Sequence, residues 1–210
     1  EGQVTVVGNG SACVVGGHAY IIKKGQRFIT NSAIASMGYD LPAAIGAWTA
    51  SRDKGCYSQG GDRSGEDLIL VTGDGSMQMN LQELQTIIHH RMGIKIFVIN
   101  NGGYHSIRQT QKNFFGEPLI GIGVDSGDLS FPALDKLAAA YGYPYVSARH
   151  NSELGEAVEK TLAAEGPAIC EVFVSMDQNF EPKSSAKRLP DGTMVSPPLE
   201  DLSPFLPDEE

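Results

Sequence analysis

Two short polar clusters near the middle of the chain carry residue types that bind a divalent cation and a phosphate group. The first is the turn Gly-Asp-Gly at 73–75, and the second is Asn-Asn-Gly-Gly at 100–103. The Asp74 carboxylate, the Asn101 amide oxygen and a carbonyl of the glycine pair are hard oxygen ligands, which Mg²⁺ or Ca²⁺ prefers. The glycines permit close approach of the backbone to an anion, and the N–H groups that follow Asp74 can face it.

The spacing of the two clusters predicts that they meet in space. Apolar runs at 68–71 and 94–99 precede them, and the 24 residues 76–99 lie between Gly75 and Asn100. That length fits one helix with its turns between two parallel strands, whose carboxyl ends share one edge of a sheet. The alternative for Asp74 alone is an ordinary turn former.

The segment between the clusters should contain one central helix. Asn80 can cap its start, and Glu83 stands where a capping box would be completed. We therefore interpret Glu83 as structural and not as a catalytic acid.

Further strands and helices alternate along the chain and predict an α/β fold, a parallel sheet with helices on both faces. A helix should begin near Asp40 and Pro42, and a solvated loop should follow at 51–66. The remaining expected elements are strands at 4–7, 28–30, 145–147 and 168–174, a turn at 8–12, and helices at 130–141 and 151–164.

The last 35 residues differ in composition from the rest. Six of the eleven prolines lie beyond Met176, among many charges and with little periodicity, which predicts an extended tail. We therefore divide the chain into a domain at 1–175 and a Pro-rich tail at 176–210.

Composition excludes several classes of protein. With 16 Lys and Arg against 25 Asp and Glu, the net charge of −9 argues against nucleic acid or an anionic membrane as a partner. Cys13, Cys56 and Cys170 are odd in number and scattered, so we expect no disulfide framework or zinc site, and a cytoplasmic location. No apolar run approaches the roughly 18 residues of a membrane helix. Because the chain opens at Glu1 without a Met, we expect a fragment or a processed piece.

The glycines at 8–10 invite a comparison with the dinucleotide-binding fingerprint, which the chain fails. Cys13 stands at the third glycine position, and no acidic residue follows about 20 residues on, at 26–28. A nicotinamide-dependent dehydrogenase is therefore rejected.

The turn at 73–75, the two dozen residues after it and the pair Asn100-Asn101 resemble the signature of the thiamine diphosphate enzymes. The resemblance implies that Asp74, the Asn101 side chain and the Gly103 carbonyl hold Mg²⁺, which bridges to the cofactor diphosphate. It covers 4–174 as a diphosphate-binding domain.

A second segment, SMGYDLPAAIGA at 36–47, resembles the acetolactate synthase motif TMGFGLPAAIGA. The resemblance implies that Met37 lies between the two cofactor rings, where core packing is the other interpretation. It also implies that the Ala35 carbonyl accepts a hydrogen bond from the pyrimidine amino group, and that a loop after the first strand contacts the diphosphate. The implied cofactor-binding residues are Gly10, Ser11, Ala35, Met37, Gly73, Asp74, Gly75, Ser76, Asn101, Gly103 and Tyr104.

The polar stretch after Asn101 corresponds to the substrate pocket of that family. His105 could contact a 2-keto acid substrate or could be an exposed loop histidine. Acetolactate synthases have a methionine and a tryptophan where this chain has Ser106 and Thr110, so carboligation and simple 2-keto acid decarboxylation by a lyase both stay open. The tail also resembles the carboxyl end of these large subunits, where it can fold across the site entrance.

One catalytic group of the family is missing from the sequence. Thiamine diphosphate supplies a carbanion and an electron sink, and its activation needs a glutamate beside the pyrimidine ring. The family carries that glutamate on a separate pyrimidine-binding domain, normally of a neighbouring subunit, which implies a homo-oligomer. We therefore expect this chain to have negligible activity alone. A non-catalytic assembly module that retains the cofactor fold is the alternative.

Overall fold

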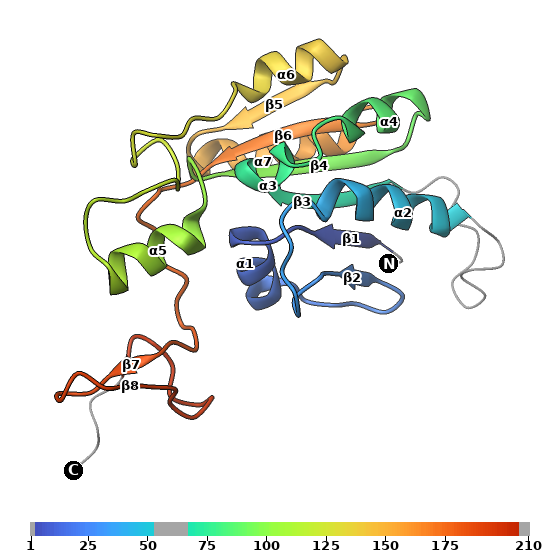
Figure 1. Ribbon diagram of the computed structural model, residues 1–210. Helices are drawn as coiled ribbons and strands as arrows, with labels where there is room; N and C mark the ends of the chain where they lie inside the picture. Colours follow the sequence, from blue (N-terminus) through green and yellow to red (C-terminus); the bar gives the residue numbers. More distant parts are fainter. Residues whose placement is uncertain (1–2, 53–66, 206–210) are drawn as a thin grey trace. The chain divides into compact units, whose positions relative to one another are not determined.

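The computed structural model describes residues 3–52 and 67–205, so Cys56 and most of the loop expected at 51–66 lie outside the described residues. Six parallel strands form one sheet in the order β2-β1-β3-β4-β6-β5 (Figure 1). Their bounds are β1 Val4–Val7, β2 Arg27–Ile29, β3 Leu68–Gly73, β4 Ile94–Asn100, β5 Tyr145–Ala148 and β6 Ala168–Phe173. The apolar runs that predicted strands therefore form the sheet.

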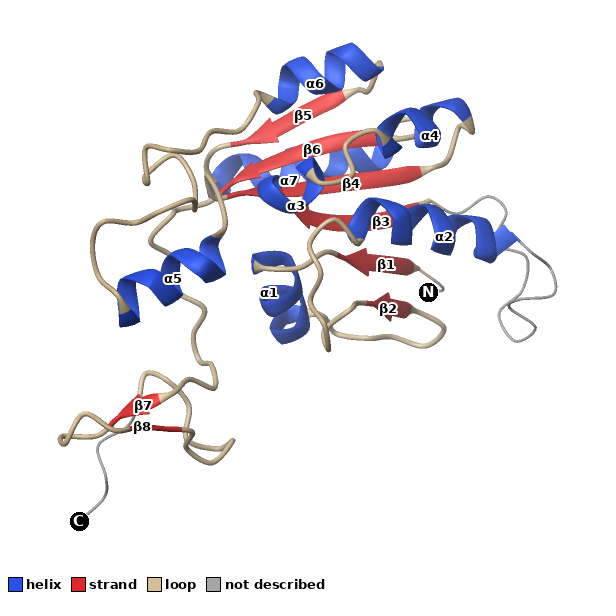
Figure 2. Cartoon of the chain, viewed as in Figure 1, coloured by secondary structure: helices blue, strands red, loops and turns tan. Residues whose placement is uncertain are grey.

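Helices cover both faces of this sheet (Figure 2). Side chains alternate along each strand, so Val4 and Val6 face one side and pack in the main core with α2, α4 and α6. The opposite side carries Cys170 against α7, and α1 lies against Val7. The bounds are α1 Ser11–Ala19, α2 Asp40–Arg52, α3 Asp74–Gln78, α4 Glu83–His89, α5 His105–Phe114, α6 Leu134–Tyr141 and α7 Asn151–Ala163. The predicted α/β class is confirmed.

The ends of the strands bring the two polar clusters together. Gly73 pairs in register with Ile99 across β3 and β4, so Asp74 and Asn101 both leave the sheet at its carboxyl edge. The arrowheads of these strands point toward the side where α5 lies (Figure 1). The strand–helix–strand unit thus places both clusters at the edge that their spacing predicted.

The predicted capping box at the central helix is wrong. The chain forms α3 directly after β3, and α4 begins only at Glu83, with Gln82 before it in a helical conformation and no side-chain cap. The Asn80 amide donates instead to the Gly38 carbonyl, on a loop 42 residues away in sequence. Asn80 therefore fastens two loops at the carboxyl edge, and α4 starts from consecutive turns.

Three stretches expected to be turns or irregular are helical, the first being Asp74 and Gly75 of the predicted Gly-Asp-Gly turn, which begin α3. The turn predicted at 8–12 ends at Gly10, because α1 begins at Ser11, and the polar stretch after Asn101 forms α5. His105, at the first position of α5, is buried, so its interpretation as an exposed loop histidine is wrong.

The chain divides into two compact units, Glu1–Met176 and Asp177–Glu210. The second unit contains a short antiparallel pair, β7 Lys187–Arg188 and β8 Met194–Val195, so it is not wholly extended as predicted. Across the described ranges, every helix falls short of the length and apolar character needed to cross a membrane.

Candidate cofactor site at the carboxyl edge

One pocket collects most of the residues that the sequence singled out. It lies where β1, β3 and β4 end and α1, α3 and α5 begin. Among the described residues, Ala35 and Thr110 are the predicted site residues outside its lining, and both are exposed. The Thr110 hydroxyl donates to the Ser106 carbonyl within α5, at 3.0 Å. The lining comprises Asn9, Gly10, Ser11, Met37, Gly73, Asp74, Gly75, Ser76, Asn101, Gly103, Tyr104, His105, Ser106 and Ile107.

Asp74 is buried at the base of this pocket, with 7% of its surface exposed. Its Oδ1 accepts the N–H of Gly75 at 2.9 Å, so this N–H is engaged by a carboxylate. Burial raises the pKa of Asp74 from an ordinary 3.8 to about 6, against the opposing effect of the backbone N–H groups of Gly75, Gly103 and Gly102. These amides place the carboxylate beside the loop that follows Asn101.

Asn101 is a buried residue of the same lining. Its Nδ2 donates to the Ser11 hydroxyl at 2.8 Å, which fixes the orientation of the amide. Within the part of the chain that the structure describes, Asn101 Oδ1 and Asp74 Oδ2 are both buried and lack a hydrogen-bond partner. Buried polar atoms are nearly always paired, so two such oxygens in one pocket indicate a missing electrophilic ligand.

Glycine is required at two positions in the walls of the site. A side chain at Gly75 would overlap the Tyr104 ring, which packs directly over that backbone. Gly103 has φ +148°, and a side chain there would overlap the Ile122 carbonyl. The Tyr104 ring in turn meets Phe131 edge to face, with centroids 5.7 Å apart. These close contacts bring the backbone of both clusters to the pocket surface.

The loop that carries Met37 is fastened on both sides of that residue. The Ser36 carbonyl accepts the side-chain amide of Asn9, and the Gly38 N–H donates to the Ser76 hydroxyl at 2.9 Å. Ala35 has φ +54°, a left-handed conformation that favours glycine. Met37 is half-buried and lines the pocket, so it is not a core residue.

Sequence reasoning missed two polar residues of this region. Asn9 lies two residues beyond the end of β1, at the carboxyl edge, a position that could have identified it. Arg108, 1% exposed, lies on α5, whose polar sequence gave no sign that an arginine would be buried. The described residues hold no group of three or more His, Cys, Asp or Glu side chains suited to a metal.

Comparisons with known proteins identify the family of this chain. Residues 8–172 match the family described as "Thiamine pyrophosphate enzyme, C-terminal TPP binding domain". The chain is 33% identical over 157 residues to the acetolactate synthase large subunit of Cyanidium caldarium, covering 74% of this chain and 24% of that protein.

Two further relatives have similar names. The acetolactate synthase of Arthrospira platensis is 31% identical over 157 residues, covering 75% of this chain and 24% of the relative. The acetolactate synthase isozyme 2 large subunit of Escherichia coli (strain K12) is 29% identical over 178 residues, covering 85% of this chain and 29% of the relative. The chain spans about a quarter of the length of the curated relatives it matches. It belongs to the thiamine pyrophosphate enzyme family, as a C-terminal TPP-binding domain like that of the acetolactate synthases.

Proposed function

We propose that this domain holds thiamine diphosphate through a Mg²⁺ ion bound by Asp74, the Asn101 side chain and the Gly103 carbonyl. The observation that supports this most is the pair of buried oxygens, Asp74 Oδ2 and Asn101 Oδ1, that have no partner among the described residues. A hard divalent cation satisfies both, because it accepts oxygen ligands of either kind.

The composition of the site favours Mg²⁺ over a cation held by protein groups alone. Mg²⁺ typically takes one or two carboxylates and completes its shell with phosphate oxygens and water. Here Asp74 is the carboxylate in the pocket lining, and Gly73, Gly75 and Gly103 line the same pocket without side chains that would keep a diphosphate away. Binding of the cation would hold Asp74 ionised in spite of its burial.

Other residues of the domain would hold the organic part of the cofactor. Met37 would support the angle between the two rings of the cofactor, and the Ala35 carbonyl would accept a hydrogen bond from the pyrimidine amino group. Gly10, Ser11, Gly73, Ser76 and Tyr104 complete the proposed binding set. Ser11 already orients the Asn101 amide, which gives it a role at the metal ligand as well as at the diphosphate.

The proposed reaction is decarboxylation of a 2-keto acid followed by carbon–carbon ligation. The relatives named acetolactate synthase support this reaction class. Bound thiamine diphosphate supplies a carbanion and an electron sink. In this chain His105 and Ser106 line the pocket, and Thr110 lies one turn further along α5, so these three would shape the substrate site.

The activating acid would come from elsewhere. We propose that a pyrimidine-binding domain supplies the activating glutamate, as in the family that this chain resembles. That domain would belong to the same gene product or to a neighbouring subunit of a cytoplasmic homo-oligomer. Residues 1–175 would then be the cofactor domain, and 176–210 a separate tail.

Cofactor binding tests the metal assignment. In the intact protein, calorimetric titration with thiamine diphosphate should show binding that requires Mg²⁺ and disappears with EDTA. Asp74→Asn should weaken this binding by at least about 100-fold, because the amide removes the anionic ligand. Lys136→Met, on the exposed side of α6, is the control and should bind as wild type. Binding that ignores both Mg²⁺ and Asp74 would refute the assignment.

Product analysis with pyruvate tests the reaction. Acetolactate would identify a carboligase, and acetaldehyde would identify a decarboxylase. The small side chains of Ser106 and Thr110 are the observation that supports the decarboxylase. We expect the 210-residue chain alone to consume negligible pyruvate, and addition of its pyrimidine-binding domain to restore turnover. Metal-dependent cofactor binding with no turnover in the complete assembly would instead support the non-catalytic module.

A further inference from the structure

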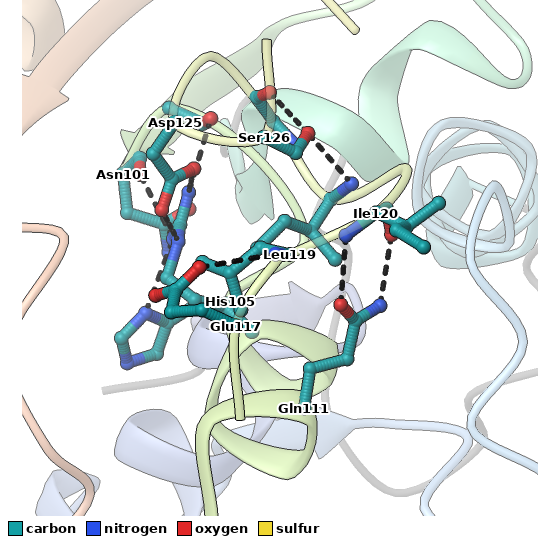
Figure 3. A network of polar contacts seen from close by, with 12 residues as sticks. Asn101, His105, Gln111, Glu117, Leu119, Ile120, Asp125 and Ser126 are labelled. Atoms are coloured by element: carbon teal, nitrogen blue, oxygen red, sulfur yellow. Dashed lines mark hydrogen bonds and ion pairs between the residues drawn. The ribbon is translucent and has the colours of Figure 1, made fainter. Parts of the chain in front are cut away.

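A buried arginine lies behind the loop that carries two of the proposed metal ligands. Arg108, the fourth residue of α5, is 1% exposed. Figure 3 shows a polar network in which Asn101, His105 and Asp125 are labelled. No part of the proposed function uses this side chain. A fully buried guanidinium is costly unless its N–H groups are paired, so its contacts define its role.

The guanidinium joins an acidic partner on one side to the metal loop on the other. Nε and Nη2 donate to the two carboxylate oxygens of Asp125, at 2.8 and 2.9 Å, in the bidentate arrangement that only arginine can make. Nη1 donates to the Asn101 carbonyl at 3.3 Å, and Nη2 donates to the Gly102 carbonyl at 3.2 Å. Nη1 also lies 3.4 Å from His105 Nδ1, which must be the acceptor because a guanidinium has none.

The segment 117–128, here called the brace, supports the same loop from outside. Gly123 pairs with Gly103 in an antiparallel bridge, the Tyr104 N–H donates to the Ile122 carbonyl at 2.7 Å, and the Val124 N–H donates to the Gly102 carbonyl at 3.2 Å. Asp125, the anchor of Arg108, belongs to this brace. The loop is therefore held between the brace and the guanidinium.

The brace is itself fixed to α5 and closed on itself. The Gln111 amide exchanges two hydrogen bonds with the backbone of Ile120, at 2.8 and 2.9 Å (Figure 3). The Ser126 hydroxyl accepts the N–H groups of Ile122 and Gly123, at 3.3 and 3.2 Å. Arg108 and Gln111 lie one turn apart on the same helix, so one rigid element sets the position of both brace and loop.

The contacts of Arg108 determine which way the carbonyls of the metal-binding loop point. The carbonyls of Asn101 and Gly102 are both turned toward Arg108, which fixes the orientation of two successive peptide groups. Asn101 and Gly103 line the pocket, and Asn101 Oδ1 is buried without a partner among the described residues, so these two residues have oxygens left to bind a cation. Without the guanidinium, the Asn101 and Gly102 carbonyls would lose these two hydrogen bonds, and Gly102, at φ +69°, has no Cβ to restrict its backbone.

We propose that Arg108, anchored by Asp125, is a positioning residue that aligns the Asn101 and Gly103 oxygens for the divalent cation. This inference rests on the proposed function, since it assumes the metal ligands named there. Asp125 also neutralises the guanidinium, which would otherwise repel a cation bound nearby. Arg108 does not touch the cation, so it acts through the geometry of the loop.

Four variants of the intact protein test this role. Arg108→Met removes the guanidinium, Arg108→Lys keeps the charge without the planar fork, and Asp125→Asn removes the anchor. The control Lys160→Met removes the exposed ion pair to Glu156 on α7, 2.6 Å long. The Mg²⁺ dissociation constant, measured by calorimetry with thiamine diphosphate present, should rise about 10 to 100-fold in Arg108→Met and Asp125→Asn. Arg108→Lys should lose about 10-fold, because an ammonium cannot reach both carbonyls and the carboxylate together.

A second measurement separates positioning from general stability. Amide hydrogen exchange in the cation-free protein should accelerate at Gly102, Gly103 and Tyr104 in the Arg108 and Asp125 variants, while the amides of β3 and β4 keep wild-type rates. A variant with a lower melting temperature but unchanged Mg²⁺ affinity and unchanged exchange in this loop would show that Arg108 only supports the fold, and would overturn the inference. So would Arg108→Lys with full wild-type affinity, since charge alone would then suffice.

Asp74→Asn distinguishes a failure of this inference from a failure of the proposed function. If wild type binds Mg²⁺, Asp74→Asn abolishes binding and Arg108→Met binds as wild type, the metal site stands and Arg108 has no part in it. If wild type itself binds no divalent cation with thiamine diphosphate present, both the metal site and the role of Arg108 are refuted.

Discussion

The two edges of the six-stranded sheet each bury a cationic side chain, but they differ in what surrounds it. At the amino edge Lys95, fully buried at the start of β4, makes an ion pair with Asp67 at 3.1 Å and donates to the carbonyls of Ala164 and Gly166. An ammonium has three donors, and three acceptors meet it. This edge is a closed structural junction between the starts of β3, β4 and β6.

The carboxyl edge is not closed in this way. Arg108 is paired there, yet four of the five buried side-chain atoms that lack a hydrogen-bond partner in the described ranges lie around this edge. They are Asn9 Oδ1, Asp40 Oδ1, Asp74 Oδ2 and Asn101 Oδ1, and the fifth is Trp48 Nε1 on α2. Each of the four is an oxygen, so the edge is short of electrophilic partners.

The difference teaches how to separate a structural buried charge from a binding site within one fold. Burial alone does not distinguish Lys95 from Asp74, since both are nearly inaccessible. The two residues differ in whether their polar atoms all have hydrogen-bond partners. A cation and a diphosphate would complete the carboxyl edge, whereas the amino edge needs nothing further. Substitutions at the two edges should therefore differ in what they disturb.

The largest effect on folding should come from the closed edge. Lys95→Met leaves Asp67 and two carbonyls without their cation, which should cost about 3 kcal/mol of unfolding free energy. Urea unfolding of cation-free protein measures it, with Lys136→Met as the surface control. The folded variant should bind Mg²⁺ as wild type. A loss of cation affinity in Lys95→Met would break the comparison, because the two edges would then be coupled.

At the carboxyl edge, removing the negative charge of Asp74 should stabilise the cation-free protein. The pKa of Asp74 is raised from 3.8 to about 6 by burial, so between these pH values the folded state binds a proton more tightly than the unfolded state. The stability this supplies is fully present below pH 3.8 and is lost as the pH rises through 6. At about 1.4 kcal/mol per pH unit the loss approaches about 3 kcal/mol.

Urea unfolding between pH 4 and 8 in EDTA checks this prediction. The quantity to compare is the difference in unfolding free energy between wild type and Asp74→Asn, because the contributions of the other carboxylates are the same in both proteins. Asp74→Asn should lack this part of the pH dependence and be the more stable protein at pH 8. Mg²⁺ with thiamine diphosphate should reverse the order. Equal pH profiles for the two proteins would mean that Asp74 is paired or solvated.

The sequence predicted the strands well because each is a short apolar run between turn residues. The two clusters were placed at the correct edge, because a helical connection between parallel strands leaves little choice of edge. That connection contains two short helices, α3 and α4, and not the single helix predicted. The capping box was wrong because Asn80 bonds to Gly38, a long-range partner that no local pattern reveals. Arg108 was missed for the same reason, because its burial depends on Asp125 arriving from a separate loop.

A smaller effect should follow from filling the close contact in the pocket wall. Gly75→Ala places a methyl group against the Tyr104 ring, and the resulting shift should cost about 1 to 3 kcal/mol and weaken cofactor binding. Gly155→Ala in α7 is the matched control, because nothing lies within 4 Å of its new methyl group. That control should gain up to about 1 kcal/mol from helix propensity. Equal stability of the two variants would show that Tyr104 does not pack on the site backbone.

The smallest effect should come from backbone strain at Ala35, on the loop that leads to Met37. Ala35 has φ +54° and its N–H donates to the Asn31 carbonyl at 2.8 Å, so its conformation is fixed although the side chain is exposed. A left-handed conformation costs a residue with a Cβ about 1 kcal/mol, which Ala35→Gly relieves at some cost in unfolded-state entropy. We expect a gain of about 0.5 kcal/mol in urea unfolding. Ala33→Gly, two residues away and without a positive φ, should instead lose a similar amount. Because Ala35→Gly keeps the carbonyl of residue 35, cofactor binding should be retained. If Ala35→Gly instead lost as much stability as Ala33→Gly, the backbone at Ala35 would not be strained.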